Sequence, residues 1–219
     1  RLTGTPSLTG LALTKVGEGT LQVLTGNATR TSATTITAGT LAVSQGNGLG
    51  SGKVTVEPGG QLQLNNGGST EMAFTASSIE LKDDAAVTGA PALQASGAVA
   101  FGQEVKLITP AAIGVESGGV LRLTGTPSLT GSALTKVGLG TLVLAGANSY
   151  SDATRIQAGI LELGGTSTLP SNAALSLSGG SAGNVTTLRL NGTAQLIGPL
   201  SAQSEFTLVD LSASGAKLT

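Results

Sequence analysis

The residues best suited to chemistry are two lysines that recur in the same short context. Lys15 lies in the pentapeptide Leu-Thr-Lys-Val-Gly, and Lys136 lies in an identical pentapeptide 136 − 15 = 121 residues later. A recurring lysine can act as a binding cation. It can also have a structural role, in which its methylene stem lies along a neighbouring segment and its ammonium donates to carbonyls of a turn. We favour the structural interpretation for both lysines.

The carboxylates offer two further candidates. Asp83 and Asp84 are adjacent, but a calcium site needs several more oxygen ligands, and Lys82 beside them dilutes their charge. We therefore expect a solvated turn. Glu57 and Glu116 occupy equivalent positions in Val-Glu-x-Gly-Gly, and they are 116 − 57 = 59 residues apart. This separation is too large for a general acid and base that act together, so both are expected at exposed turns.

The residue types missing from the chain exclude several classes of site. The sequence has no His and no Cys, which excludes a Ser-His-Asp triad, histidine metal sites, thiolate sites and disulfides. The stretch GNGLGSGKV at 46–54 resembles a phosphate-binding loop only superficially, because Val54 stands where Ser or Thr should bind magnesium. The sequence thus predicts no catalytic, cofactor-binding or metal-ligating residue and no cofactor. Four aromatic residues, too few for a sugar- or base-stacking surface, are expected in the core or as caps: Phe74, Phe101, Tyr150 and Phe206.

The composition points to a packed β protein with a weakly charged surface. Only 11% of the 219 residues are charged, against about 25% in an average protein. The formal net charge is −1 and the basic residues are scattered, so no nucleic-acid partner is expected. No apolar run is long enough for a membrane helix. The first residues show no signal peptide, and we expect the chain to be a segment of a longer protein.

The elements that must position these residues are short, repeated strands. The decamer RLTGTPSLTG occurs at 1–10 and again at 122–131, and Leu13–Asn27 aligns with Leu134–Asn148 at the same offset. Runs of four to six residues alternate in polarity and are separated by bends rich in Gly, Asn, Ser and Pro. This pattern predicts strand after strand and an all-β fold.

The repetition favours a solenoid over a sandwich or a small barrel. Near-identical strands with small aliphatic residues suit a coil in which each Leu lies above another Leu at about 4.8 Å. We predict a right-handed parallel β-helix with about 20–25 residues per circuit and about nine to ten circuits. Residues 1–121 and 122–219 would be two repeat blocks of one continuous solenoid, the first about five circuits long. Four glycines would give the backbone freedom to bend: Gly17, Gly19, Gly138 and Gly140.

Two segments resemble the passenger-associated transport repeat of bacterial autotransporters. That pattern has a Leu-Thr-Lys-x-Gly-x-Gly-Thr-Leu strand, an Asn-x-Tyr turn and a strand that ends in Ala-Gly-x-Leu. The first copy matches at Lys15, Gly17, Gly19, Thr20, Leu21 and Asn27. The second copy matches at Lys136, Gly138, Gly140, Thr141, Leu142, Asn148 and Tyr150. The first copy departs from the pattern with Thr29 in place of Tyr, and the second has Asp152 where Gly is common.

The resemblance implies a β-helical stalk on the exterior of a bacterial outer membrane or in secreted form, with an outer-membrane barrel domain elsewhere in the parent chain. We expect this stalk to be non-enzymatic and to support adhesion or self-association through its ends or faces. An alternative is an adhesin whose own β-helix face binds a host-cell or bacterial-surface ligand. A polysaccharide-degrading β-helix enzyme is less favoured, because twelve acidic and eleven basic residues leave little charge to cluster on one face.

Overall fold

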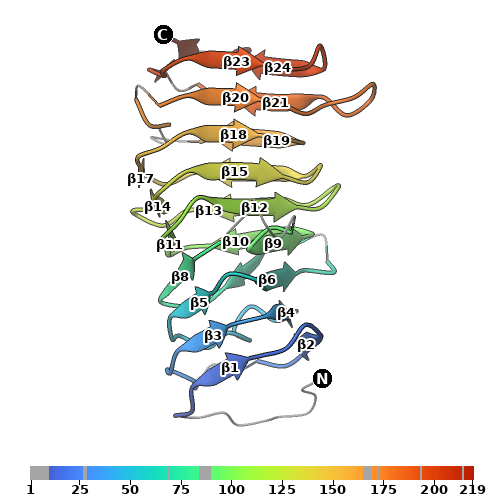
Figure 1. Cartoon of the computed structure of the whole chain (residues 1–219), viewed down its shortest axis with the longest axis vertical. Helices are drawn as coiled ribbons and strands as arrows, with labels where there is room; N and C mark the ends of the chain where they lie inside the picture. The colour runs from blue at the N-terminus through green and yellow to red at the C-terminus, as the bar shows by residue number, and fades with distance from the viewer. Residues whose placement is uncertain are drawn as a thin grey trace.

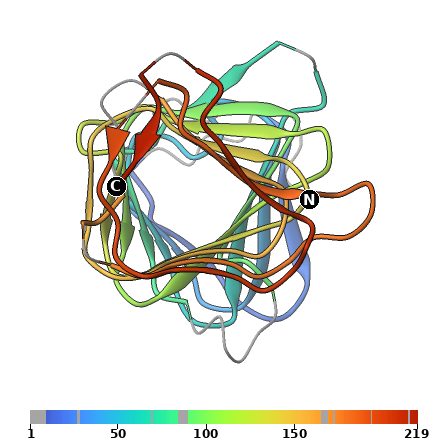
Figure 2. The ribbon, with the colours of Figure 1, turned by 90° about the horizontal axis from the view of Figure 1, so that it is seen from above.

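The computed structural model of the chain is an elongated coil of parallel strands (Figure 1). It describes residues 10–26, 29–68, 70–83, 90–164, 169–171, 173–192, 194–213 and 215–219. These residues contain no helix. Seen along its long axis, the backbone winds around a single interior (Figure 2). The predicted parallel β-helix is confirmed, with about nine circuits as judged from its longest, nine-stranded sheet.

Three parallel sheets form the sides of the coil. Sheet A contains β2 (Thr20–Val23), β4 (Gly39–Val43), β6 (Gly60–Asn65), β9 (Leu93–Ser96), β12 (Ala111–Val115), β15 (Leu134–Val137), β18 (Thr154–Ile156), β20 (Leu175–Leu177) and β23 (Leu200–Ala202). Sheet B contains β1 (Leu13–Lys15), β3 (Thr34–Ile36), β5 (Val54–Val56), β8 (Ser78–Leu81), β11 (Glu104–Leu107), β14 (Leu129–Gly131) and β17 (Asn148–Tyr150). Sheet C contains β7 (Met72–Phe74), β10 (Ala98–Phe101), β13 (Val120–Leu123), β16 (Thr141–Leu144), β19 (Ile160–Leu163), β21 (Thr186–Arg189) and β24 (Thr207–Asp210). A fourth, two-stranded sheet pairs β22 (Ala194–Gln195) with β25 (Lys217–Leu218).

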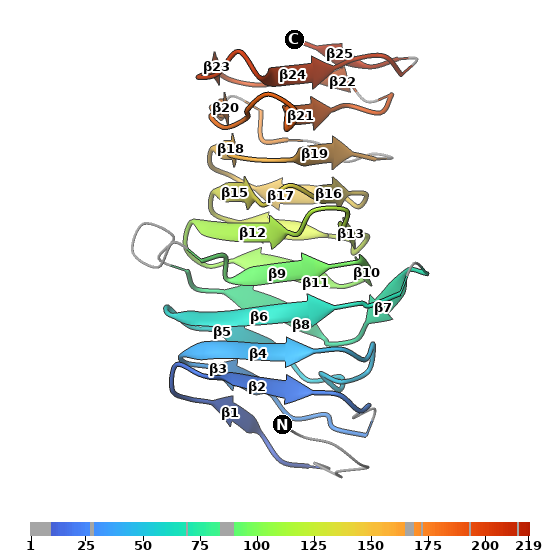
Figure 3. The same ribbon diagram turned by 90° about the vertical axis from the view of Figure 1, so that its right-hand side faces the viewer.

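One rung is one circuit of the coil, and it visits the sheets in the order B, A, C. The strands β8, β9 and β10 make up such a rung, and β11, β12 and β13 make up the next (Figure 3). Paired residues of neighbouring rungs are between 150 − 131 = 19 residues apart, for Gly131 and Tyr150, and 93 − 62 = 31 residues apart, for Leu62 and Leu93. This range is wider than predicted, because the bends between strands, which we call corners, differ in length.

The interior is a stack of aliphatic ladders. Along sheet C, paired positions place five apolar side chains one above another, and all of them are buried: Val99, Leu121, Leu142, Leu161 and Leu188. The alternation of polarity in the sequence directs these side chains inward and their neighbours outward. Burial of each leucine contributes about 1.5–3 kcal/mol. Stability is therefore distributed along the rod, because each rung packs on its two neighbours.

The first two rungs close differently from the rest. No strand of sheet C is present there in the described residues, since β7 is the first member of that sheet. The loops that follow β2 and β4 cover this side, and they bury Arg30 and Leu49. The guanidinium of Arg30 donates to the Leu49 carbonyl at 2.6 Å, which ties the two loops together. A buried arginine thus closes the side of the coil that leucine ladders close further along.

The glycines of the repeats serve the corners in different ways. Gly17 and Gly138 have φ values of 71° and 74°, which a residue with a side chain rarely adopts. At Gly140 a Cβ atom would lie only 2.2 Å from the Glu116 carbonyl oxygen, so the need is for close approach of two rungs. Gly19 has neither constraint. The predicted backbone freedom is therefore required at Gly17 and Gly138, whereas Gly140 is required for close approach and Gly19 for neither reason.

The two sequence repeats lie on different sides of the coil. The segment that begins at Leu13 forms β1 and β2 in sheets B and A, whereas the equivalent segment at Leu134 forms β15 and β16 in sheets A and C. The interval is five rungs, from β1 to β14, plus one further side to β15. A whole number of rungs, as expected from the sequence, would have placed both copies on the same side. The two copies can lie on different sides because the same repeat sequence can form either a B/A corner or an A/C corner.

The boundary between residues 121 and 122 lies inside β13, which pairs with β10 and with β16 on its two sides. The backbone runs through this point in one strand. We therefore keep 1–121 and 122–219 as a proposal about duplication of the sequence, within a single continuous solenoid.

Candidate functional site

The recurring lysines close two corners of the coil from inside. Lys15 ends β1 and Lys136 lies in β15, with both side chains on the interior face, in register with Ile36 and Ile156 respectively. Each ammonium donates to two carbonyls of its own corner and to one carbonyl of the next rung. The acceptors are Val16, Gly17 and Ala38 for Lys15, and Val137, Gly138 and Ala158 for Lys136, at 2.5–3.1 Å. Each lysine therefore joins two successive rungs, which is the structural role predicted from the sequence.

Burial lowers the pKa of the Lys136 ammonium. Its side chain is fully buried, and its three bonded partners are neutral carbonyls. Removal of the ammonium from water lowers the pKa of Lys136 from 10.5 to about 8. At neutral pH the side chain is still mostly protonated, because its pKa lies above 7. The group thus acts as an internal three-way hydrogen-bond donor and is inaccessible to a ligand.

Tyr150 has an equivalent in the first repeat that the sequence alignment misplaces. The buried Tyr150 hydroxyl lies 2.7 Å from Thr154 Oγ1, and burial raises the Tyr150 pKa well above its usual value. In the first copy the buried guanidinium of Arg30 donates to Thr34 Oγ1. Both contacts link residues i and i+4. Arg30, and not the neighbouring threonine, therefore occupies the place of the expected tyrosine, and its pKa is lowered by desolvation.

The carboxylate candidates that the structure describes do not come together. Asp83 is buried, and its Oδ2 accepts a hydrogen bond from the Ala112 backbone N–H at 3.0 Å, so the expectation of a solvated turn is wrong for this residue. Asp84 lies outside the described residues. Glu57 follows β5 at a B/A corner and accepts from Lys82 Nζ at 2.8 Å. Glu116 follows β12 at an A/C corner, a different edge of the coil, so the two glutamates share no site.

The remaining candidates have structural positions. The glycine-rich stretch at 46–54 is a bend that leads into β5, and no helix follows it. Phe74, Phe101 and Tyr150 are buried in the core and Phe206 is half-buried. Among the described residues no group of three or more acidic side chains could hold a metal ion. No helix in this part of the chain is long and apolar enough to cross a membrane.

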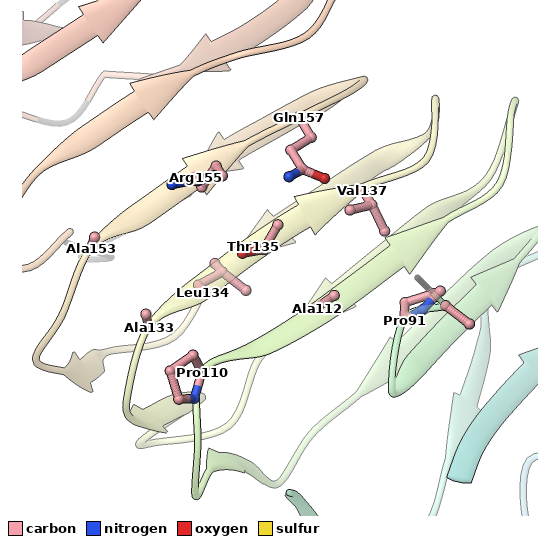
Figure 4. A pocket seen from close by; sticks show the side chains of 11 residues that line it. Pro91, Pro110, Ala112, Ala133, Leu134, Thr135, Val137, Ala153, Arg155 and Gln157 are labelled. Atoms are coloured by element: carbon pink, nitrogen blue, oxygen red, sulfur yellow. The ribbon is translucent and has the colours of Figure 1, made fainter. Parts of the chain in front are cut away.

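The outer face of sheet A carries a groove that sequence reasoning missed. It has a volume of about 510 Å³ and runs across β12, β15 and β18 (Figure 4). Its lining is mostly small and apolar: Ala90, Pro91, Pro110, Ala112, Ala133, Leu134, Val137 and Ala153. The polar lining consists of Thr135, Arg155 and Gln157. No sequence motif marks this groove, because it depends on the alignment of outward positions from three rungs.

Comparison with known proteins bears on the two lysine corners. A family model described as the passenger-associated-transport-repeat matches residues 13–43 and 134–163. The chain carries two passenger-associated-transport-repeats. This confirms the resemblance seen in the sequence and is consistent with an autotransporter passenger domain. No curated protein and no solved structure matches the chain.

Each passenger-associated-transport-repeat contains the same corner in two successive rungs. The first contains β1 to β4 and the second contains β15 to β19, and within each the lysine joins the lower rung to the upper one. Arg155 and Gln157 of the groove belong to the second repeat, where the aligned residues of the first are Thr35 and Thr37. The repeat therefore supplies a scaffold, and its outward side chains differ between the copies. The repeats and the β-solenoid together fit an autotransporter passenger stalk.

Proposed function

We propose that the chain is a structural β-helical stalk of a secreted or cell-surface autotransporter-like protein, and that this stalk supports adhesion or self-association. The observation that carries the proposal is the pair of passenger-associated-transport-repeats inside one continuous solenoid. The repeat family implies a secreted or cell-surface location. The parent chain would supply an outer-membrane barrel domain, and the solenoid would supply length.

A stalk must lengthen when rungs are added, and the register identifies a rung that can be copied. Thr141 pairs with Ile160, so residues 141–159 form one circuit through sheets C, B and A. Four tandem copies inserted after residue 159 should lengthen the rod by about 19 Å, at about 4.8 Å per rung. Small-angle X-ray scattering should show this increase with an unchanged cross-section. A Gly/Ser insert of equal length is the control, and the stalk proposal fails if both inserts give the same particle length.

Self-association through the ends is part of this proposal. In the described part of the chain, β23 and β24 are the last strands of sheets A and C, and each has a partner strand on one side. Three leucines on or next to these strands are exposed, namely Leu200, Leu208 and Leu211. Unpaired strand edges with apolar side chains favour association. Sedimentation velocity should show oligomers that Leu208→Lys reduces, and a monodisperse monomer at high concentration would contradict association through this end.

A second proposal is direct binding of a host-cell or bacterial-surface ligand by a face of the β-helix. The groove over sheet A favours it, because a concave apolar surface with a few polar groups is typical of binding sites. Cell-binding assays on the isolated segment test it, and clean negatives would assign adhesion to other parts of the parent protein.

We propose no catalytic role and no nucleic-acid partner. On the outer face of sheet C, Arg189 donates to Glu162 at 3.0 Å and to Asp210 at 3.2 Å, so these charges neutralise one another across rungs. Neither Glu162 nor Asp210 is therefore free to act as an acid on a sugar. Turnover of polygalacturonate or another polysaccharide by the purified chain would overturn this proposal.

A further inference from the structure

The groove over sheet A is built from nine aligned outward positions. Three successive rungs each contribute three positions at a spacing of two. The set is Pro110, Ala112 and Gly114 in or next to β12, then Ala133, Thr135 and Val137 in or next to β15, then Ala153, Arg155 and Gln157 in or next to β18. All of them except Gly114 line the groove. The smallest side chains lie on the lowest of the three strands and the largest on the highest. This gradient hollows the face.

Pro91 closes one end of the groove. A Cβ atom at Gly114 would lie 2.7 Å from Pro91 Cγ, so the absence of a side chain at Gly114 lets the proline ring settle on the sheet. Ala112 is 5% exposed although it faces outward, which shows how far the floor is recessed. The floor and the closed end are therefore apolar and rigid, because they belong to paired strands and a packed proline.

The opposite rim carries a cation that has no acidic partner among the described residues. Arg155 lines the groove and is exposed, and none of the ion pairs in the described part of the chain includes it. Two half-buried arginines of the described residues differ in this respect, since Arg122 pairs with Glu71 and Arg189 pairs with two carboxylates. Gln157 and Thr135 add one amide and one hydroxyl beside the guanidinium. The rim therefore complements a carboxylate.

We propose that this groove binds an extended peptide segment in which an acidic side chain is flanked by small apolar residues. The carboxylate pairs with Arg155, the apolar side chains lie on the alanines and prolines of the floor, and the peptide backbone bonds to Gln157 and Thr135. This inference rests on the second proposal above, that a face of the β-helix binds surface ligands directly. It names the face and the class of ligand.

The lining favours a peptide over an acidic sugar. None of the residues that line the groove is aromatic, so no ring is available to stack on a sugar. A sugar would also place several hydroxyls against Ala112, Ala133 and the prolines, where they would have no hydrogen-bond partner. Apolar peptide side chains suffer no such loss. The outward positions from Ala133 to Val137 are four residue steps apart, or about 13 Å, which matches an extended peptide of four to five residues.

The test is a titration of the isotopically labelled chain with acetylated, amidated Ala-Val-Glu-Val, followed through backbone amide shifts. Addition should shift the amides of Thr135, Val137 and Gln157. Arg155→Gln should weaken binding about fivefold, as expected for one exposed charge pair. The peptide with Gln in place of Glu should bind with the weaker affinity to both proteins. Arg122→Gln, at a half-buried arginine of sheet C, is the control and should leave the affinity unchanged.

A second variant tests the groove without changing its charge. Thr135→Phe fills the centre of the face from a half-buried outward position and should abolish the shifts while the fold is retained. The proposal is overturned if neither Arg155→Gln nor Thr135→Phe weakens binding, or if millimolar peptide shifts none of these amides. It is also overturned if glucuronate, an acidic sugar, shifts the same amides at lower concentration than the peptide. If cell binding survives Arg155→Gln, the groove proposal fails and the proposal that a face of the β-helix binds ligands stands. The rod-length test of the stalk does not depend on either of these binding proposals.

Discussion

The buried ammonium of Lys136 makes the stability of the solenoid depend on pH in an unusual direction. In the folded chain its pKa is about 8, whereas the unfolded chain has the ordinary value of 10.5. Between these two values the unfolded state binds more protons than the folded state. The free energy of unfolding therefore rises as pH rises through this window. Lys136→Met removes the titrating group and should remove the rise.

The size of the effect follows from the two pKa values. From pH 7 to pH 9.5, linkage gives an increase of about 2 kcal/mol in the free energy of unfolding. The range stops at 9.5 because Tyr150 acts in the opposite sense above pH 10. Its pKa is raised in the folded state, so the stability that it contributes is lost once the unfolded tyrosine ionises.

Urea denaturation followed by circular dichroism at pH 7 and pH 9.5 measures this directly. The wild type should gain about 2 kcal/mol at the higher pH, and Lys136→Met should gain close to nothing. Lys106→Met, at an exposed position on the outer face of sheet B, is the control and should keep the wild-type gain. A wild type whose stability is flat or falls over this range would refute the reasoning, as would a Lys136→Met variant that gains as much as the wild type.

Five other substitutions test the corners and the core by chemical denaturation. Gly17→Ala should destabilise by about 1–2 kcal/mol because of its positive φ alone. Gly138→Ala should destabilise by clearly more, because its Cβ atom would also lie 2.3 Å from a backbone carbonyl oxygen, and equal losses would count against close approach as the cause. Tyr150→Phe should lower the free energy of unfolding by about 1 kcal/mol, because it removes a single hydrogen bond. Arg30→Met should lower it by about 2–4 kcal/mol, because several buried acceptors lose their donor. A larger loss for Tyr150→Phe than for Arg30→Met would contradict the equivalence of these two positions. Leu142→Ala should cost about 2–5 kcal/mol from the middle of a ladder, and a loss below 1 kcal/mol would mean that the neighbouring rungs do not pack on it.

The fold could be predicted because its signals are local and repeated. Alternation of Leu with polar residues fixes which side chains face inward, and a glycine such as Gly138 marks a bend that only a residue without a side chain makes easily. Stacking of identical rungs then follows from the repetition. The role of Lys136 could also be predicted, because a long stem with a polar end suits an interior position near free carbonyls.

Other features required the register between rungs, which a single sequence does not contain. Asp83 was expected at the surface, but the strand that follows in the next rung places the Ala112 N–H against its carboxylate. Arg30 was overlooked because the one extra residue of the first repeat precedes it, whereas the alignment placed this length difference after it. The groove is a stronger case still. Arg155 and Ala112 are 43 residues apart (155 − 112), and only two successive strand pairings bring them to one face.

The second repeat lies one side further around the coil than the first. This displacement determines the directions in which the outward residues of the repeats point. A copy displaced by whole rungs would present its outward residues along the same line as the original. Here the outward residues of the second copy lie on a different side of the coil, so a duplication followed by divergence of outward residues would place new side chains on another side. A long passenger built in this manner would carry its binding surfaces in a spiral around the long axis. It could then contact partners on several sides without a hinge.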